Sequence, residues 1–177
     1  MESPDERRGR FEEIYAANHD PILAYVLRRS GSGEDAADAL AETFLTAWRR
    51  LEDIPAGDRA RLWLFGVARR VLANQRRGER RRSALSVRLR ADLVQAIRDG
   101  GLRSEHAAVS AAFDSLPERD RELLSLAAWE GLDAGEIAEV FGCSRSAARV
   151  RMHRARQRFA RELQRHGEAS YAQMVTA

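Results

Sequence analysis

Residues 132–158 read LDAGEIAEVFGCSRSAARVRMHRARQR, and they predict two helices joined by a very tight turn. Asp133 is suited to cap the first helix, and Glu136 three residues later completes a capping-box pattern. Gly142 can adopt the left-handed conformation that ends a helix, and Ser144 can cap the next helix. A short helix, a tight turn and a long helix form a helix-turn-helix, whose second helix enters the DNA major groove.

The second helix of this motif combines one apolar stripe with Arg on its other faces. The stripe consists of Ala148, Met152, Ala155 and Phe159. The other faces carry Arg145, Arg149, Arg151, Arg154, Arg156 and Arg158. Such a charged face is often merely solvated, and a helix-turn-helix can also serve only for packing. The tight turn, the two caps and the one-sided charge together favour DNA binding over both alternatives.

We predict different roles for the polar residues at the start of this helix. The predicted DNA-binding residues are Arg145, Ser146, Arg149, Arg151, His153 and Arg154. Arg145, Ser146 and Arg149 follow the cap directly, and the N-terminal residues of a recognition helix reach base edges. His153 continues their face. The flanking Arg151 and Arg154 are better placed for phosphates, which position a protein without specifying sequence.

The composition limits the class of protein. With 177 residues, of which 44% are apolar, the chain can form one compact domain or two small ones. All 30 basic residues are Arg, which suits phosphate and guanine contacts, although a GC-rich genome is the explanation we prefer. The net charge of +3 and the pI of about 9.7 are only mildly basic. One Cys, no long apolar run and no signal peptide lead us to expect a soluble cytoplasmic protein without membrane insertion.

Charge is segregated along the chain. Residues 59–82 contain nine Arg and one Glu, and residues 145–165 contain eight Arg and one Glu. Residues 34–53 contain six acidic residues and two Arg, and residues 114–139 contain eight acidic residues and two Arg. The basic stretches can neutralise phosphates, whereas the acidic ones suit core packing or a protein partner.

The N-terminal half predicts three helices, over residues 11–29, 34–51 and 59–82. We expect residues 1–10 to be frayed, and Pro21 to kink or restart the first helix. The second helix has an apolar stripe of Leu40, Phe44, Ala47, Trp48 and Leu51. Another face of it carries Asp35, Asp38 and Glu42.

The third of these helices has an apolar stripe beside a dense polar face. Its stripe is Trp63, Val67 and Val71, widened by Leu64, Ala68 and Leu72. Its polar face carries Arg61, Arg69, Arg70, Asn74, Arg76 and Arg77. Aromatic side chains beside Arg suit unstacked single-stranded bases, although Trp63 and Phe65 can equally be core residues.

The remaining segments complete an all-α fold of two small helical domains joined by a linker. The domains are residues 1–82 and 108–177, and the linker, residues 83–107, has room for one weak helix over about 87–98. Pro117 fits the first turn of a helix that stops near Gly131, and the last dozen residues show no strong pattern. No nucleotide-binding, zinc-protease or nucleophile motif occurs, and the four His are scattered, so we expect no enzyme, no cofactor and no metal. Cys143, in the tight turn, is expected to be a small packing residue.

Three segments together resemble a bacterial RNA polymerase sigma factor of the extracytoplasmic-function (ECF) type. Residues 35–48, DAADALAETFLTAW, resemble the family's DAEDLVQETFxxAW segment, and residues 61–69, RLWLFGVAR, resemble its RAWLxxIAR segment. Leu-Pro at 116–117, Glu-Ile-Ala at 136–138 and RMHRAR at 151–156 resemble the family's LP…EIA…RLHRAR pattern. Their shared order and spacing make the match specific, over about residues 10–82 and 108–163.

The resemblance implies a promoter-specificity subunit of RNA polymerase. Its implied partners are core RNA polymerase, through the β′ clamp and the β flap, promoter DNA at the −35 and −10 elements, and an anti-sigma factor. The implied polymerase-binding residues are Asp35, Asp38 and Glu42. The implied −10-binding residues are Arg61, Trp63, Arg69, Arg70, Asn74 and Arg77, and the helix-turn-helix would read the −35 element. We expect the factor to be cytoplasmic, and nucleoid-associated within the holoenzyme.

Two residues depart from the family pattern: Ala41 stands where Gln is common, and Arg70 stands where Asn is common. The linker length is compatible with the assignment. About 17 base pairs at ~3.4 Å each separate the two promoter elements by roughly 58 Å, and the extended linker reaches up to ~85 Å.

Two rival functions remain at this point. A free-standing helix-turn-helix regulator would bind specific DNA tightly without polymerase, whereas a sigma factor binds it weakly alone. A helical adaptor that sequesters another protein would need neither Arg-rich face, so it explains less of the sequence.

Overall fold

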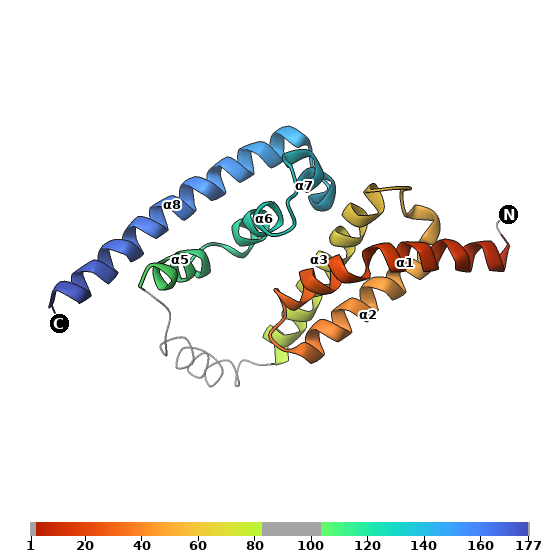
Figure 1. The fold of residues 1–177 in the computed structure, drawn as a ribbon, viewed down its shortest axis with the longest axis horizontal. Helices are drawn as coiled ribbons and strands as arrows, with labels where there is room; N and C mark the ends of the chain where they lie inside the picture. The colour runs from red at the N-terminus through yellow and green to blue at the C-terminus, as the bar shows by residue number, and fades with distance from the viewer. Residues whose placement is uncertain (1–2, 83–103, 177) are drawn as a thin grey trace. The chain divides into compact units, whose positions relative to one another are not determined.

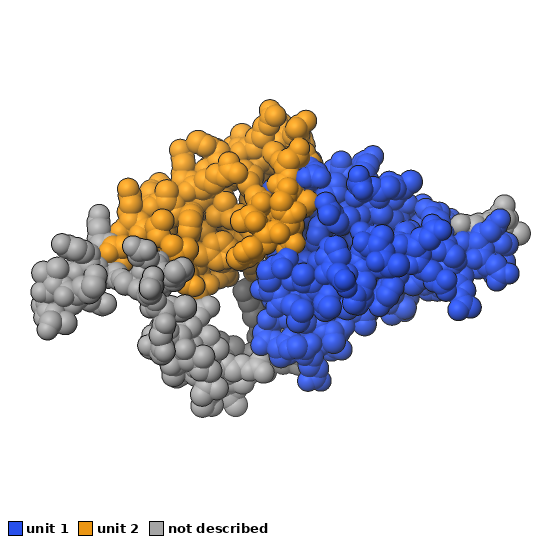
Figure 2. All heavy atoms as spheres, in the orientation of Figure 1, with its two compact units in different colours: residues 1–81, 136–143 blue, residues 82–135, 144–177 orange. Residues whose placement is uncertain are grey.

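The computed structural model describes residues 3–82 and 104–176, and every regular element within them is helical (Figure 1). The chain divides into two compact units (Figure 2). The first comprises residues 1–81 and 136–143, and the second comprises residues 82–135 and 144–177. The predicted all-α fold built from two small helical domains is confirmed, while the exact domain limits stay a prediction.

Three helices build most of the first unit. They are α1 (Pro4–Leu27), α2 (Gly33–Arg49) and α3 (Arg59–Arg82), with a short 3-10 turn η1 (Leu51–Asp53) after α2. Their buried side chains form one core, whose largest members are Ile22, Tyr25, Leu51, Leu64 and Phe65. The rings of Tyr25 in α1 and Phe65 in α3 lie 5.1 Å apart, so the aromatic centre of this core joins the first and third helices.

The start of α1 contradicts the expected fraying over residues 3–10, while residues 1 and 2 lie outside the described residues. Ser3 and Glu6 form a capping box, in which the Glu6 amide donates to Ser3 Oγ (3.2 Å) and the Ser3 amide donates to Glu6 Oε2 (2.8 Å). Hydrogen bonds from Ser3 to the Glu6 carboxyl, first from the backbone amide and then from the hydroxyl, lower the pKa of that carboxyl. The helix therefore begins at Pro4, where a missing N–H costs nothing.

Pro21 does not break α1, which continues through it to Leu27. After Pro21, the side chains of Ile22, Tyr25 and Val26 are completely buried. A proline inside a helix costs about 3 kcal/mol. Burial of each of these side chains contributes roughly 1.5–3 kcal/mol, so core packing outweighs the local penalty.

Helix α2 buries a face slightly rotated from the predicted stripe. Ala36, Ala39, Thr43, Phe44 and Ala47 are buried. The expected stripe member Trp48 is instead 37% exposed and packs edge-on against Phe11 of α1, with ring centroids 5.2 Å apart. Because α2 ends at Arg49, Leu51 reaches the core from η1.

Helix α3 has the predicted bounds, but its buried stripe is rotated by about one residue. Leu64, Ala68 and Leu72 are buried, whereas Trp63 and Val71 are only half-buried. Phe65 is a core residue, as the alternative interpretation held. The rotation brings Trp63 to the edge of the polar face.

The second unit is built around α8 (Arg145–Thr176), which packs against α5 (Ser104–Asp114) and α6 (Glu118–Ala128). Phe113 and Phe159 meet edge-on with centroids 6.3 Å apart, and Arg158 pairs with Asp120. Helix α5 has no counterpart among the predicted helices, and its first four residues fall in the predicted linker. Pro117 occupies the N-cap position just before α6 and so does not lie in its first turn.

The last dozen residues, which show no strong sequence pattern, are helical up to Thr176, where α8 ends. The predicted weak helix over 87–98 lies outside the described residues. The remaining helix, α7 (Ala134–Phe141), belongs with the first unit over residues 136–143.

Candidate functional site

The tight turn between α7 and α8 has the predicted geometry. Gly142 has φ +61°, and the Cys143 amide donates to the carbonyl of Ala138 (2.9 Å). Ser144 Oγ accepts a hydrogen bond from the Ala147 amide (3.2 Å), which caps the start of α8. At the other end of α7, Asp133 Oδ1 accepts from the Gly135 amide (2.5 Å). Both predicted caps therefore form.

The polar residues at the start of α8 differ in how freely their side chains are presented. Arg145, Ser146, Arg149, His153 and Arg154 are exposed, and Arg151 is half-buried. Arg145 forms an ion pair with Asp133, with 3.7 Å between Nη2 and Oδ2. Ser146 Oγ lies 3.1 Å from Ser144 Oγ. Arg149 and Arg154 form no hydrogen bond or ion pair with any other described residue. Ala148, Met152 and Ala155 are buried as predicted, while Phe159 is half-buried.

The three acidic residues predicted on α2 are not equivalent. Asp35 is half-buried at the helix start, where its carboxylate accepts from Ser32 Oγ (2.5 Å) and its amide donates to the same oxygen (3.1 Å). Asp38 and Glu42 are exposed, and within residues 3–82 and 104–176 their carboxylates have no partner. Asp35 therefore stabilises the helix, and Asp38 and Glu42 remain available.

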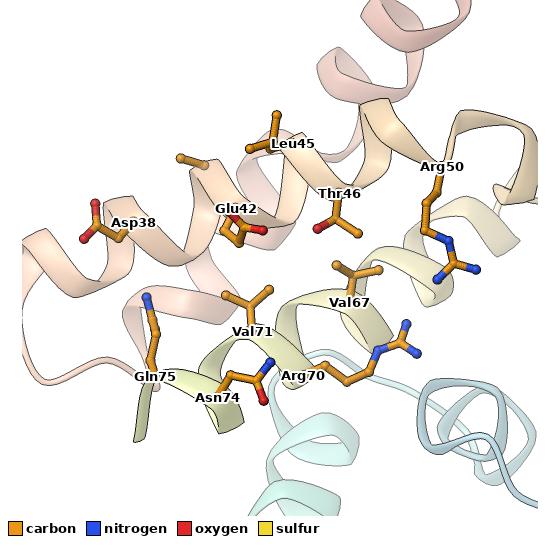
Figure 3. A pocket seen from close by; sticks show the side chains of 11 residues that line it. Asp38, Glu42, Leu45, Thr46, Arg50, Val67, Arg70, Val71, Asn74 and Gln75 are labelled. Atoms are coloured by element: carbon orange, nitrogen blue, oxygen red, sulfur yellow. The ribbon is translucent and has the colours of Figure 1, made fainter. Parts of the chain in front are cut away.

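A groove runs between α2 and α3, and we call it the α2–α3 groove (Figure 3). Its α2 side is formed by Asp38, Ala41, Glu42, Leu45 and Thr46, with Arg50 at one end. Its α3 side is formed by Val67, Arg70, Val71, Asn74 and Gln75. The structure thus brings predicted polymerase-binding and predicted −10-binding residues to one groove, together with both departures from the family pattern, Ala41 and Arg70.

The predicted −10 residues lie on different sides of α3. Helical periodicity places Trp63, Arg70, Asn74 and Arg77 on one face, and Arg61 on the opposite one. Arg77 donates to Asn74 Oδ1 (2.6 Å) within this face. Arg61 lines a separate hollow, whose other walls are α1 and residues 55–58. The predicted set therefore cannot act as one surface.

Arg69 is held by contacts inside the first unit. Its guanidinium carbon lies 4.6 Å from the centre of the Phe141 ring, and its buried Nε has no hydrogen-bond partner in the described residues. Nearby, Arg59 Nε pairs with Glu139 Oε2 (3.1 Å). Arg70, one position along, is exposed and free of such contacts in the described parts of the chain.

The sequence analysis missed several groove residues, and two of them, Leu45 and Arg50, have distinctive surroundings. Leu45 on α2 is 42% exposed, although it is a large apolar side chain. Arg50 caps the end of α2 and lies with its guanidinium carbon 5.9 Å from the Trp63 ring centre. The double Arg at 49–50, after an apolar stripe, was the available signal for Arg50.

Two kinds of feature are absent from the described residues. No three His, Cys, Asp or Glu side chains in residues 3–82 and 104–176 are grouped as a metal ion requires. Over the same ranges, no helix has both the length and the apolar character that membrane crossing demands.

Comparison with known proteins identifies the family. Residues 14–82 match Sigma-70 region 2, and residues 106–159 match Sigma-70, region 4. The ECF RNA polymerase sigma factor EcfG of Rhodopseudomonas palustris is 26% identical over 137 residues, which cover 77% of this chain and 76% of EcfG. The chain belongs to the ECF family of RNA polymerase sigma factors. It is therefore a promoter-recognition subunit, and the predictions of family and function are confirmed.

Solved structures agree with this assignment. CnrH in complex with the cytosolic domain of CnrY has a TM-score of 0.57 and 26% identity to this ECF factor, over 87% of each chain. The sigma factor RpoE of Bartonella quintana, in complex with the anti-sigma factor NepR, has a TM-score of 0.59 at 21% identity. That match covers 87% of this chain and 96% of RpoE, and it shows the shared fold.

Proposed function

We propose that this sigma factor brings core RNA polymerase to promoters with −35 and −10 elements and helps to melt the −10 region, with no catalysis of its own. Residues 1–82 would bind polymerase and the −10 element, and residues 108–177 the −35 element, with residues 83–107 as a linker. The single observation that carries this division of labour is the charge on the described surfaces. Within the described residues, α2 exposes the unpaired carboxylates of Asp38 and Glu42. Helix α3 exposes the unpaired guanidinium of Arg70, and α8 exposes those of Arg149 and Arg154.

Asp38 and Glu42 of α2 are the proposed contacts to the β′ clamp. Their spacing of four residues places both on one side of the helix, where they can face basic residues of the clamp. We assign Asp35 a supporting part, because its carboxylate is engaged by Ser32. The proposed contact of residues 108–177 is the β flap.

The proposed −10 surface is the face of α3 that carries Trp63, Arg70, Asn74 and Arg77. A half-buried Trp beside exposed Arg suits unstacked bases and their phosphates. Arg61 lies on the opposite side, and Arg69 is stacked on Phe141, so we give both a secondary role.

The proposed −35 surface is the start of α8. Arg145, Ser146 and Arg149 would read base edges, and His153 would extend that face. Arg151 and Arg154 would hold phosphates. The exposure of Arg149 and Arg154 supports these roles, since neither side chain is committed to another described residue.

An anti-sigma factor is a further proposed partner, acting in the cytoplasm on the factor when it is not bound to polymerase in the nucleoid. RpoE and NepR form such a sigma and anti-sigma complex. The exposed acidic face of α2 is a suitable surface for it, because covering Asp38 and Glu42 would also exclude the clamp.

The deciding experiment is transcription in vitro from a genomic fragment library, by core polymerase with and without this chain. The proposal expects initiation at a small set of promoters only when the chain is present. A free-standing regulator would instead bind specific DNA tightly without core enzyme, and initiation that is the same with and without the chain would refute the proposal.

A further inference from the structure

The end of the α2–α3 groove near Arg50 is positively charged, whereas Asp38 and Glu42 line the groove further along α2. Arg50, from the end of α2, and Arg70, from the middle of α3, reach into this end from opposite sides (Figure 3). The same two residues also line the neighbouring hollow that contains Trp63. Two guanidiniums from different segments thus border the same hollow as an aromatic ring, and the Arg50 guanidinium carbon lies 5.9 Å from the centre of that ring.

The positive charge at this end is not neutralised by groove carboxylates. Glu42, the nearest acidic residue on the α2 side, precedes Arg50 by eight residues, which is about 12 Å along a helix. Glu139 lines the neighbouring hollow, but its carboxylate is paired with Arg59 at 3.1 Å. Outside the groove, Arg50 forms an ion pair with Asp53 through its Nε (2.8 Å), which fixes the side chain. The terminal nitrogens of Arg50 have no partner within the described residues and stay available for a ligand.

We propose that Arg50 and Arg70 form a clamp for one backbone phosphate of the melted −10 strand, with the adjoining base against Trp63. Guanidiniums present forked N–H donors that suit phosphate oxygens, and an aromatic ring beside them can take a base face. This inference rests on the proposed promoter function and extends it, because Arg50 directly follows α2, the helix assigned to polymerase binding. Arg70 adds a charge where related factors commonly have Asn, so the clamp is a property of this chain.

The test uses holoenzyme made from core polymerase and the full chain. The probe is a fork-junction DNA from a promoter found in the transcription experiment, with its non-template −10 strand single-stranded. The variants are Arg50→Gln, Arg70→Asn and the double substitution. Arg49→Gln is the matched control, since Arg49 is an exposed neighbour that does not line the groove.

Each clamp variant is expected to bind the probe roughly two- to fivefold more weakly than wild type, as for an exposed charge pair. Because both Arg residues share one phosphate, the slope of log affinity against log salt should fall by about 0.7 in the double variant, and not by twice that amount. Arg49→Gln should match wild type.

A second measurement locates the phosphate. Probes carrying one neutral methylphosphonate linkage are compared at each position of the single strand. One position should weaken wild type and Arg49→Gln equally, weaken Arg50→Gln and Arg70→Asn less, and leave the double variant unaffected. Sensitivity of the two single variants to different positions, or full wild-type sensitivity of the double variant at that position, would overturn the clamp.

Two controls separate this outcome from other failures. Circular dichroism and affinity for core enzyme should be unchanged in both single variants, and Arg70→Asn carries the test if Arg50→Gln unfolds. If Arg50→Gln weakens binding of a protein partner while the phosphate scan is flat, the site holds a protein carboxylate and the proposal fails. A wild-type chain that directs no initiation would instead refute the promoter function itself.

Discussion

Helices α3 and α8 both carry many Arg residues beside an apolar stripe, yet they present those residues differently. In α3, Arg69 is stacked on Phe141, Arg76 donates to the carbonyl of Arg29 (3.4 Å), and Arg77 donates to Asn74. The arginines of α3 are therefore largely tied to the protein, and only Arg70 on the groove face is exposed without a partner in the described residues.

In α8, by contrast, two arginines near the start of the helix are unrestrained, although Arg158 further along is paired with Asp120. Arg149 and Arg154 are exposed, and neither contacts a charged or hydrogen-bonding partner within the described parts of the chain. The number of Arg residues on a helix thus does not decide what the helix does. A guanidinium anchored as Arg69 is stabilises its own fold, whereas one as unrestrained as Arg149 keeps its donors for a ligand.

The largest expected effect is a loss of stability when a buried apolar side chain of α3 is truncated, compared with an exposed one of α8. Leu64 of α3 is completely buried, whereas Val150 of α8 is half exposed. Leu64→Ala should lower the free energy of unfolding of the first unit by about 2–5 kcal/mol, because it leaves a cavity. Val150→Ala should change stability by less than about 0.5 kcal/mol. Urea unfolding followed by hydrogen exchange measures each unit separately, and equal losses of stability would mean that burial does not distinguish Leu64 from Val150.

The next effect sharpens the comparison within α8. Arg149→Ala should lose roughly 1–3 kcal/mol at one base pair of the −35 element and relax the preference there. Arg154→Ala should weaken binding about equally on all sequences and flatten the salt dependence by about one unit. Transcription of randomised −35 libraries by the two variants distinguishes them. Identical base preferences in wild type and both variants would show that Arg149 does not read a base.

A smaller effect is expected when the charge of α2, the neighbour of α3, is reversed. Asp38→Arg combined with Glu42→Arg should weaken core polymerase binding by about 1 kcal/mol, or roughly fivefold, since exposed pairs are individually weak. Both side chains are exposed, so the fold should survive. A pull-down of core enzyme measures the loss, with Glu34→Arg as an exposed control on the same helix. Unchanged affinity would contradict the assignment of α2 to the polymerase.

The sequence predicted the elements whose local chemistry is strong. The caps at Asp133 and Ser144, the left-handed Gly142 and the bounds of α3 all follow from short-range rules. The same capping-box rule applies to Ser3 and Glu6, and overlooking it produced the error at the N-terminus. The continuation through Pro21 depends on burial in the core, which local rules cannot supply.

The misses elsewhere have a similar physical origin. Helix α5, SEHAAVSAAFD, is packed through small residues such as Ala112, which give little helical periodicity to detect. The α2–α3 groove combines residues more than twenty positions apart, so sequence spacing could not join Glu42 to Arg70. Likewise, the stacking of Arg69 on Phe141 joins distant segments, and it removes Arg69 from the freely exposed set.

The smallest effect tests the comparison most directly, by treating one anchored and one unrestrained arginine alike. Arg76 of α3 is half-buried and bonded to the Arg29 carbonyl, whereas Arg154 of α8 is exposed. Arg76→Ala should lower the free energy of unfolding by about 0.5–1 kcal/mol, as expected for one lost hydrogen bond, and leave −35 binding unchanged. Arg154→Ala should do the reverse, with stability unchanged and the salt dependence of DNA binding reduced. Hydrogen exchange gives the free energy of unfolding of each variant, and DNA titrations give its affinity for the −35 element. If Arg76→Ala reduced −35 binding as much as Arg154→Ala did, a general loss of positive charge would explain both results, and anchoring would have no part in deciding which arginines serve DNA.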